Sequence, residues 1–198
     1  INLDGTSFAI LHSFGSDGDG FVVGGGLVLA GNTLFGTTAY GGSNSTGAIF
    51  RMNTDGSGYS LLKHFSALTY DPFLGYYRSI DGQSPLAGLM LAGGTLFGTT
   101  SGGGTNGNGT AFKINTDGSG FSTLHNFGDS PNGSRPESTL VVRSNVLYGA
   151  TPSGGDWDAG TVFSITLPTF PTILTQPTSR TNDSNTTATF SVLADGAA

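Results

Sequence analysis

The chain has 198 residues, of which 34 are Gly and 14 are Phe, and only 10% are charged. Gly is a poor helix former, whereas Phe, Thr and Val favour strands, so this composition predicts an all-β fold with almost no helix. The net charge of −6 repels a phosphate backbone and argues against nucleic acid as a partner. No apolar run approaches the about 18 residues of a membrane-spanning helix, so we expect no membrane insertion in this segment.

The beginning of the chain and its lack of cysteine bear on its location. The sequence starts at Ile1, without Met and already inside a repeat. This start predicts that a segment such as a signal peptide precedes it. A β protein without Cys suits a secreted or surface protein that is stabilised by packing alone. We therefore expect an extracellular or bacterial cell-surface location.

One short stretch organises the chain. Residues 34–38 (LFGTT) return at 96–100 (LFGTT) and at 147–151 (LYGAT), and in each copy a glycine that opens a second stretch follows 13 residues after the leucine. Successive copies lie 62 and 51 residues apart, so the unit is about 51 residues long. The extra 11 residues of the longer step fall between Phe65 and Asp81.

Each unit is predicted to contain four strands. In the first copy they cover residues 27–30, 33–38, 48–53 and 58–65, separated by turns such as Asp-Gly, a strong hairpin signal. Apolar residues on both faces favour stacking of one sheet on the next. Four strands in about 50 residues is the period of a β-propeller blade.

The repeat predicts where the strands and the core lie. We expect three four-stranded units, within a domain of residues 1–166, with their first three strands near residues 27–53, 89–115 and 140–166. Residues 8–14 match the fourth strand of a unit. Phe50, Phe112 and Phe163 are expected to be equivalent core residues.

These elements resemble the GloVer tandem repeat of secreted bacterial proteins, which carry varied C-terminal anchors. The pattern includes L-Y-G-T-T, a glycine pair, G-T-V-F, a D-G turn, L-H-x-F and D-G-x-x-P-x-x-G-L, which residues 81–89 match closely. The first copy departs from it at residues 19–23, which lack the proline. The resemblance covers residues 1–166 and implies a propeller-like (kelch-like) fold and a surface location. It brings no established catalytic activity.

The last part of the chain, residues 167–198, has a different character. Pro168, Pro171 and Pro177 mark a linker, and residues 187–193 alternate like a strand. Residues 171–177 and 188–192 look like the first two strands of a bacterial Ig-like domain. A whole Ig sandwich needs about 100 residues and a core Trp, so we expect only an extended, incomplete Ig-like segment.

The residues that could take part in catalysis or metal binding recur with the repeat units. His12 and His125 share a position that Lys63 fills in the middle copy, which indicates a structural role instead of a catalytic base. The Asp-Gly loops lack EF-hand spacing, so turn chemistry is favoured over calcium binding, which stays the minor alternative. No helix is predicted after the glycine pairs to hold a phosphate. The sequence predicts neither an enzyme nor a metal or cofactor.

Two features break the repetition. The insertion places aromatic residues in one loop, and the third copy carries the only Trp of the chain between two acids. In a propeller both loop types emerge on one face, where aromatics flanked by acids suit sugar stacking or a protein contact. The alternative is that the insertion packs only against its own unit. The candidate ligand-binding residues are Tyr70, Phe73, Tyr76, Tyr77, Arg78, Asp156, Trp157 and Asp158. A glycosidase reading of Asp156 and Asp158 is the least favoured, since loop neighbours rarely face each other across a bond.

The number of strands at the two ends of the repeat domain predicts how the chain functions. The N-terminus supplies only a fourth strand and the third unit lacks one after Thr166, while closure within one chain would make a ring below the usual minimum of about four blades. We therefore expect a non-enzymatic structural protein that forms a homo-oligomer or homopolymer by strand exchange, with residues 187–193 added to a neighbour's sheet edge. The alternatives are a tail that lies against its own repeats and a carbohydrate-binding or adhesive module with glycan partners. The candidate assembly residues are Phe8, Leu11, Phe14, Thr187, Thr189, Phe190 and Val192.

Overall fold

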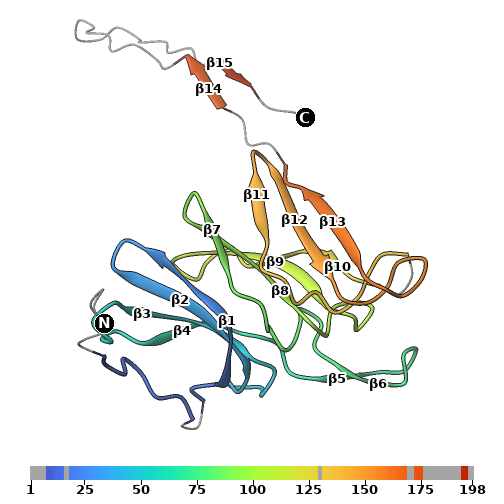
Figure 1. Cartoon of the computed structure of the whole chain (residues 1–198), viewed down its shortest axis with the longest axis horizontal. Helices are drawn as coiled ribbons and strands as arrows, with labels where there is room; N and C mark the ends of the chain where they lie inside the picture. Colours follow the sequence, from blue (N-terminus) through green and yellow to red (C-terminus); the bar gives the residue numbers. More distant parts are fainter. Residues whose placement is uncertain (1–7, 16–17, 129–130, 169–171, 176–192, 196–198) are drawn as a thin grey trace, which may run out of the picture.

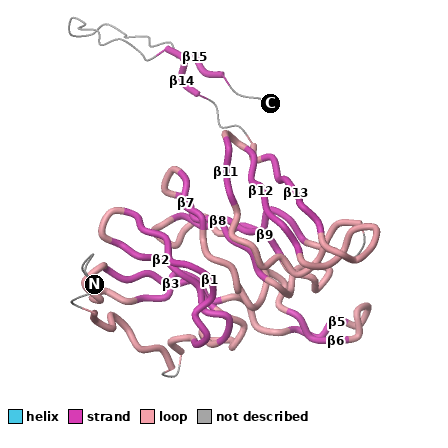
Figure 2. The backbone as a smooth tube through the Cα atoms, in the orientation of Figure 1, coloured by secondary structure: helices cyan, strands magenta, loops and turns pink. Residues whose placement is uncertain are grey.

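The computed structural model describes residues 8–15, 18–128, 131–168, 172–175 and 193–195. These residues form strands, turns and loops, and no helix occurs among them (Figure 2). The all-β prediction is therefore confirmed.

Three antiparallel sheets follow one another along the chain, and Figure 1 shows them as successive layers. Sheet 1 has the order β1 (Phe21–Ala30), β2 (Thr33–Tyr40), β3 (Ala48–Asn53) and β4 (Ser60–His64). Sheet 2 has the order β7 (Met90–Ala92), β8 (Thr95–Thr100), β9 (Thr110–Asn115) and β10 (Ser122–Asn126). Sheet 3 consists of β11 (Val141–Arg143), β12 (Val146–Thr151) and β13 (Thr161–Thr166).

Two short hairpins complete the described fold. The insertion forms β5 (Thr69–Asp71) and β6 (Tyr76–Arg78), and β14 (Thr172–Thr175) pairs with β15 (Leu193–Asp195). The first three strands of each unit lie where the repeat predicts them, and the fourth strand is present in the first two units. The expected fourth strand of the third unit is absent from the described residues, so the prediction of three four-stranded units is right for two of them. β1 is longer than expected, because it continues past a bulge between Gly24 and Val28. No strand pairing among the described residues joins sheet 1 to sheet 3, so the three sheets form an open stack.

The strand register explains the glycine of the repeated LFGTT stretch. That glycine lies opposite the phenylalanine of the next strand, whose ring covers it. A Cβ atom built on the glycine would approach the ring Cζ to 2.5, 2.6 and 2.4 Å in the three units. No side chain fits there. The paired residues are Gly36 and Phe50, Gly98 and Phe112, and Gly149 and Phe163.

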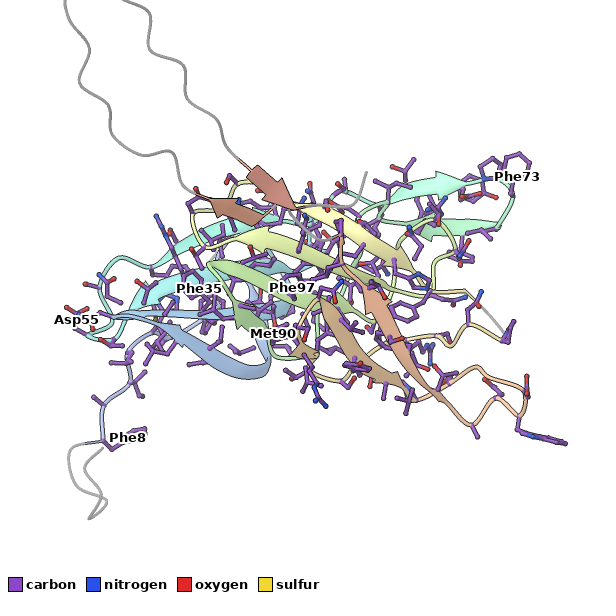
Figure 3. All side chains as sticks on the ribbon, turned by 90° about the horizontal axis from the view of Figure 1, so that it is seen from above. Phe8, Phe35, Asp55, Phe73, Met90 and Phe97 are labelled. Atoms are coloured by element: carbon purple, nitrogen blue, oxygen red, sulfur yellow. The ribbon has the colours of Figure 1, made fainter. Side chains whose placement is uncertain are left out.

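The apolar core lies between the sheets. Phe35 and Ile49 of sheet 1 pack with Leu96 and Phe112 of sheet 2, and Phe97 continues the core from the other face of sheet 2. Figure 3 shows Phe35 and Phe97 in the interior. Sheet 2 is therefore buried on both faces, as the sequence predicts for a stacked repeat.

The expected equivalence of the three core phenylalanines is only partly right. Phe50 and Phe112 are fully buried, but Phe163 is only partly buried. The physical reason is that sheet 3 has three strands, whereas β4 and β10 flank the equivalent rings of the other sheets.

Candidate functional site

The fourth strands of sheets 1 and 2 are each followed by a phenylalanine that contacts the next sheet. Phe65, directly after β4, lies edge-on to Phe112 of sheet 2 with ring centroids 5.5 Å apart. Phe127, directly after β10, lies in the same way 4.8 Å from Phe163 of sheet 3. A fourth strand therefore completes its own sheet and covers the next.

Residues 8–14 occupy this fourth-strand position on sheet 1. Phe14 lies 5.1 Å from Phe50, as Phe65 lies beside Phe112. His12 stacks on Tyr59 with centroids 3.9 Å apart and 9° between the rings.

Sheet 2 repeats the stacking contact: the ammonium of Lys63 lies 4.6 Å from the centroid of Phe121, where His12 lies over Tyr59 in sheet 1. A further contact also repeats, since a Cβ at Gly56 would meet Leu11 and a Cβ at Gly118 would meet Leu62.

The prediction that residues 8–14 form a strand is wrong for the isolated chain. These residues carry no strand assignment. A strand requires a hydrogen-bonded neighbour, and no described strand pairs with this segment. Phe8 is 77% exposed, and Figure 3 shows it extending away from the sheets.

A polar pair accompanies β4 and another accompanies the matching N-terminal segment, residues 8–14. Lys63 Nζ lies 2.5 Å from a carboxylate oxygen of Asp81, and His12 Nε2 lies 3.0 Å from Asp19. Burial alone would raise the pKa of Asp81, but hydrogen bonds from Lys63, Ser66 and Ser79 outweigh it and hold that pKa below its usual value.

The same position in the third unit has no acid. Asn132 takes the place of Asp81 in the repeat, and burial lowers the pKa of the facing His125. His125 is therefore an uncharged ring at neutral pH. His125, Asn132 and Phe163 border a depression of about 240 Å³, which also touches Pro131 and Val162. In the first two units this place holds the ring of Tyr59 or Phe121.

Apolar residues are exposed at both ends of the stack. Val162 of β13 is 85% exposed, whereas Ile49 at the same repeat position is fully buried. Leu27 of β1 is 50% exposed, whereas its counterpart Leu140 is 1% exposed. Tyr148 faces solvent where Phe35 and Phe97 are buried. Each end of the stack therefore exposes residues whose counterparts are buried where sheet 1 meets sheet 2 or where sheet 2 meets sheet 3.

The predicted ligand-binding residues of the insertion lie on the β5–β6 hairpin. Arg78 forms an ion pair with Asp71 at 2.5 Å and donates to the carbonyl of Gly104, while the Tyr76 hydroxyl donates to the carbonyl of Asn106. The Arg78 contact lowers the pKa of Asp71. Because Gly104 and Asn106 belong to the β8–β9 loop, the insertion docks on the following unit and not only on its own.

The remaining candidates are exposed. Tyr70 and Tyr77 lie edge to face with centroids 5.3 Å apart, and Phe73 at the hairpin tip is 97% exposed. Trp157 on the β12–β13 loop is 91% exposed. The hairpin and this loop lie on the same side of the molecule in Figures 1 and 3. No ring contact or hydrogen bond joins them within the described residues, so they form two separate patches.

The acids beside Trp157 differ in their surroundings. Asp158 accepts a hydrogen bond from the backbone N–H of Gly154 at 2.7 Å and has a φ of 51°. It therefore shapes the loop. Asp156 is exposed.

The assembly residues predicted in the tail lie outside the described residues: Thr187, Thr189, Phe190 and Val192. What the structure describes there is the antiparallel pairing of residues 172–175 with residues 193–195. The Ig-like character of this segment stays a prediction.

Sequence reasoning missed the open depression beside His125. A signal for it exists in the repeat, since the aromatic position of Tyr59 and Phe121 has Thr172 at the matching distance in the third copy. Asking which contact each repeat position makes, and which copy lacks its partner, would have revealed it.

The described residues contain no group of three or more His, Asp or Glu side chains that could hold a metal ion. The part of the chain that the structure describes has no helix long and apolar enough to cross a membrane.

Repeated antiparallel sheets that stack on one another, each built from the same repeated stretches of sequence, define a tandem-repeat β protein. The model of the Gloeobacter/Verrucomicrobia repeat matches residues 66–197, two thirds of the sequence. The chain belongs to this family. The match includes sheets 2 and 3 and continues past Thr166, the predicted end of the repeat domain. No match is found among curated proteins.

Proposed function

We propose that the chain is a non-enzymatic structural module of the cell surface or extracellular space that polymerises through its two end sheets. The observation that carries this proposal is an open sheet edge. Among the described residues, sheet 3 has three strands where sheets 1 and 2 have four, so β13 lies at an edge of its sheet. Residues 8–14 match the fourth strand of a unit but carry no strand assignment. Unpaired strand edges are sites for strand addition. A propeller-like closed ring or an open fibre arises according to the angle between successive copies.

The exposed apolar residues support the same proposal. Val162 and Tyr148 at one end of the stack and Leu27 at the other face solvent, and no described sheet covers them. Exposed apolar surface is a feature of protein interfaces. The negative charge of the chain is compatible with this contact, because the end residues named above are uncharged.

The experiment is a concentration series by light scattering. The chain should increase in average mass with concentration, and Val162→Lys should reduce that mass, because a lysine at the end sheet opposes stacking. Trp157→Ala is the matched control, since Trp157 is equally exposed but lies on a loop, and it should assemble normally. A chain that remains a monomer at every concentration refutes the proposal.

Carbohydrate binding or adhesion is the second candidate, favoured by the exposed rings of Phe73, Tyr77 and Trp157. Flat aromatic faces with polar neighbours bind sugar rings by stacking. A glycan array should then give a signal that Trp157→Ala reduces and Val162→Lys preserves. Absence of any glycan signal for the parent chain excludes this candidate.

A further inference from the structure

We propose that the β5–β6 hairpin binds an uncharged saccharide in the depression that Tyr70, Asp71 and Arg78 border. This inference rests on the carbohydrate-binding candidate above and deepens it. It adds a subsite on the hairpin to the one that the Trp157 loop would provide, it names the polar groups that bind the sugar hydroxyls, and it restricts the ligand to saccharides without charge.

The hairpin is fixed to the rest of the fold at its base and along one face. At the base, Asp81 accepts hydrogen bonds from the backbone N–H of Ser66 at 2.8 Å and from the hydroxyl of Ser79 at 2.9 Å. Because Ser66 precedes the hairpin and Ser79 follows it, this carboxylate joins its two ends. Along the face, Tyr76 and Arg78 donate to carbonyls of the β8–β9 loop. A site that is ordered before the ligand arrives loses little conformational entropy on binding.

Strand alternation gives the hairpin a docked face and a free face. Neighbouring residues of a strand point to opposite faces, so Tyr77 points away from the face on which Tyr76 and Arg78 are docked. Tyr70 pairs with Tyr77 across the two strands and therefore shares its face. The two tyrosines are 52% and 64% exposed. The rings of the free face are therefore accessible to a ligand.

A depression of about 220 Å³ lies along β5 and combines an aromatic ring with polar groups. It is lined by Thr69, Tyr70, Asp71, Arg78 and Ile80. A sugar ring has faces of C–H groups and an edge of hydroxyls. An aromatic ring beside hydrogen-bonding side chains matches both parts of such a ligand.

The ion pair in this depression is polar but carries no net charge. Arg78 donates from Nε at 2.8 Å and from a terminal nitrogen at 2.5 Å to the same carboxylate oxygen of Asp71. With the bond to the carbonyl of Gly104, three of the five N–H groups of the guanidinium have an acceptor among the described residues. The other two, together with the hydroxyl of Thr69, supply hydrogen bonds for sugar hydroxyls.

The charge of the chain selects against acidic saccharides. Asp71 already neutralises Arg78, so the depression has no cation left to bind a uronic acid or a sulfated sugar. The net charge of −6 also repels such ligands. The ligand class that fits is therefore a neutral saccharide.

The size of the free face favours a small ligand over a protein partner. A standard protein interface takes about 20–30 residues from each side. The hairpin consists of residues 69–78, and one of its faces is already docked on the β8–β9 loop, so it offers fewer residues than such an interface needs. Its depression is also smaller than the about 300–1,000 Å³ of pockets for drug-sized ligands. A single sugar unit suits it, and the ring of Tyr77 extends the surface toward the next unit.

The test is a glycan array that carries neutral and uronic-acid-containing oligosaccharides, followed by titration calorimetry of the full chain with the neutral oligosaccharide that binds best. Tyr70→Ala should weaken this binding by about tenfold or more, because it removes the stacking ring. Thr69→Val should weaken it by about two- to tenfold, because it removes one hydroxyl and keeps the shape of the side chain. Acidic oligosaccharides should bind less than neutral ones.

Tyr40→Ala is the matched control, since Tyr40 is a similarly exposed tyrosine on β2 of sheet 1. It should bind like the parent chain. Thr69, Tyr70 and Tyr40 are all exposed, so the thermal unfolding midpoints of the variants should stay close to that of the parent and exclude misfolding as the cause of a loss. Equal losses in Tyr70→Ala and Tyr40→Ala would overturn the hairpin site, and a preference for acidic oligosaccharides would overturn the ligand class.

The remaining outcomes separate this inference from the candidate function on which it rests. If Trp157→Ala reduces the signal and Tyr70→Ala leaves it unchanged, the hairpin site fails and carbohydrate binding stands. If no saccharide on the array binds the parent chain, both fail.

Discussion

Replacement of Phe112 by Ala should lower the free energy of unfolding by about 3–5 kcal/mol, the range for a fully buried phenylalanine. The Phe112 ring has no exposed surface and contacts Phe65 and Phe121, so it joins the fourth strand of sheet 1 to sheet 2. Removal of this ring would leave a cavity in the core that sheets 1 and 2 share. Chemical denaturation of the parent and the variant measures this difference.

Phe163→Ala is the control for this prediction. It removes the same ring at the same repeat position, but from a partly buried site beside an open depression. The loss in unfolding free energy should be smaller under conditions where the chain is monomeric. Equal losses at Phe112 and Phe163, or no loss at Phe112, would show that the fourth strand does not determine the burial of this ring.

Gly98→Ala should cost about 1–3 kcal/mol of unfolding free energy or more, the range for overpacking a core. The new methyl group would lie 2.6 Å from Cζ of Phe112 and 2.9 Å from a methyl of Leu89. Both neighbours are buried, so neither ring nor methyl can move without disturbing the contact between sheets 1 and 2.

Gly26→Ala provides the comparison, because a Cβ at Gly26 meets no atom within 4 Å. It should change the unfolding free energy little. The midpoints of thermal and urea unfolding of the two variants report the contrast. A Gly98→Ala variant as stable as the parent would mean that the ring of Phe112 does not cover the glycine in solution.

The strand order within a unit could be read from the sequence, because turn residues and apolar alternation are local signals. Gly31 and Asn32 mark one turn and the Asp-Gly pair at 55–56 marks another, and the structure has strands on either side of both. The repeat added the boundaries of the second and third units. These elements could be predicted without knowing which strand packs against which sheet.

What the sequence did not predict depends on contacts between units. Periodicity identified residues 8–14 as a strand, but whether a strand forms depends on a neighbour that local sequence does not specify. The docking of Arg78 on Gly104 joins residues 26 positions apart through a backbone carbonyl, which leaves no trace in side-chain patterns. The sequence also did not predict that Val22 has a positive φ of 57°, since Val normally indicates a regular strand.

The overlap of each fourth strand with the following sheet has a consequence for folding. Because Phe65 belongs to the chain segment of sheet 1 but to the core shared with sheet 2, the boundaries of the sheets are not the boundaries of the cooperative units. A self-sufficient block would begin at a fourth-strand segment and end at a third strand, as residues 58–115 do. Fragments cut at such positions should retain cooperative unfolding better than fragments cut between sheets, in keeping with the nearest-neighbour coupling of repeat arrays.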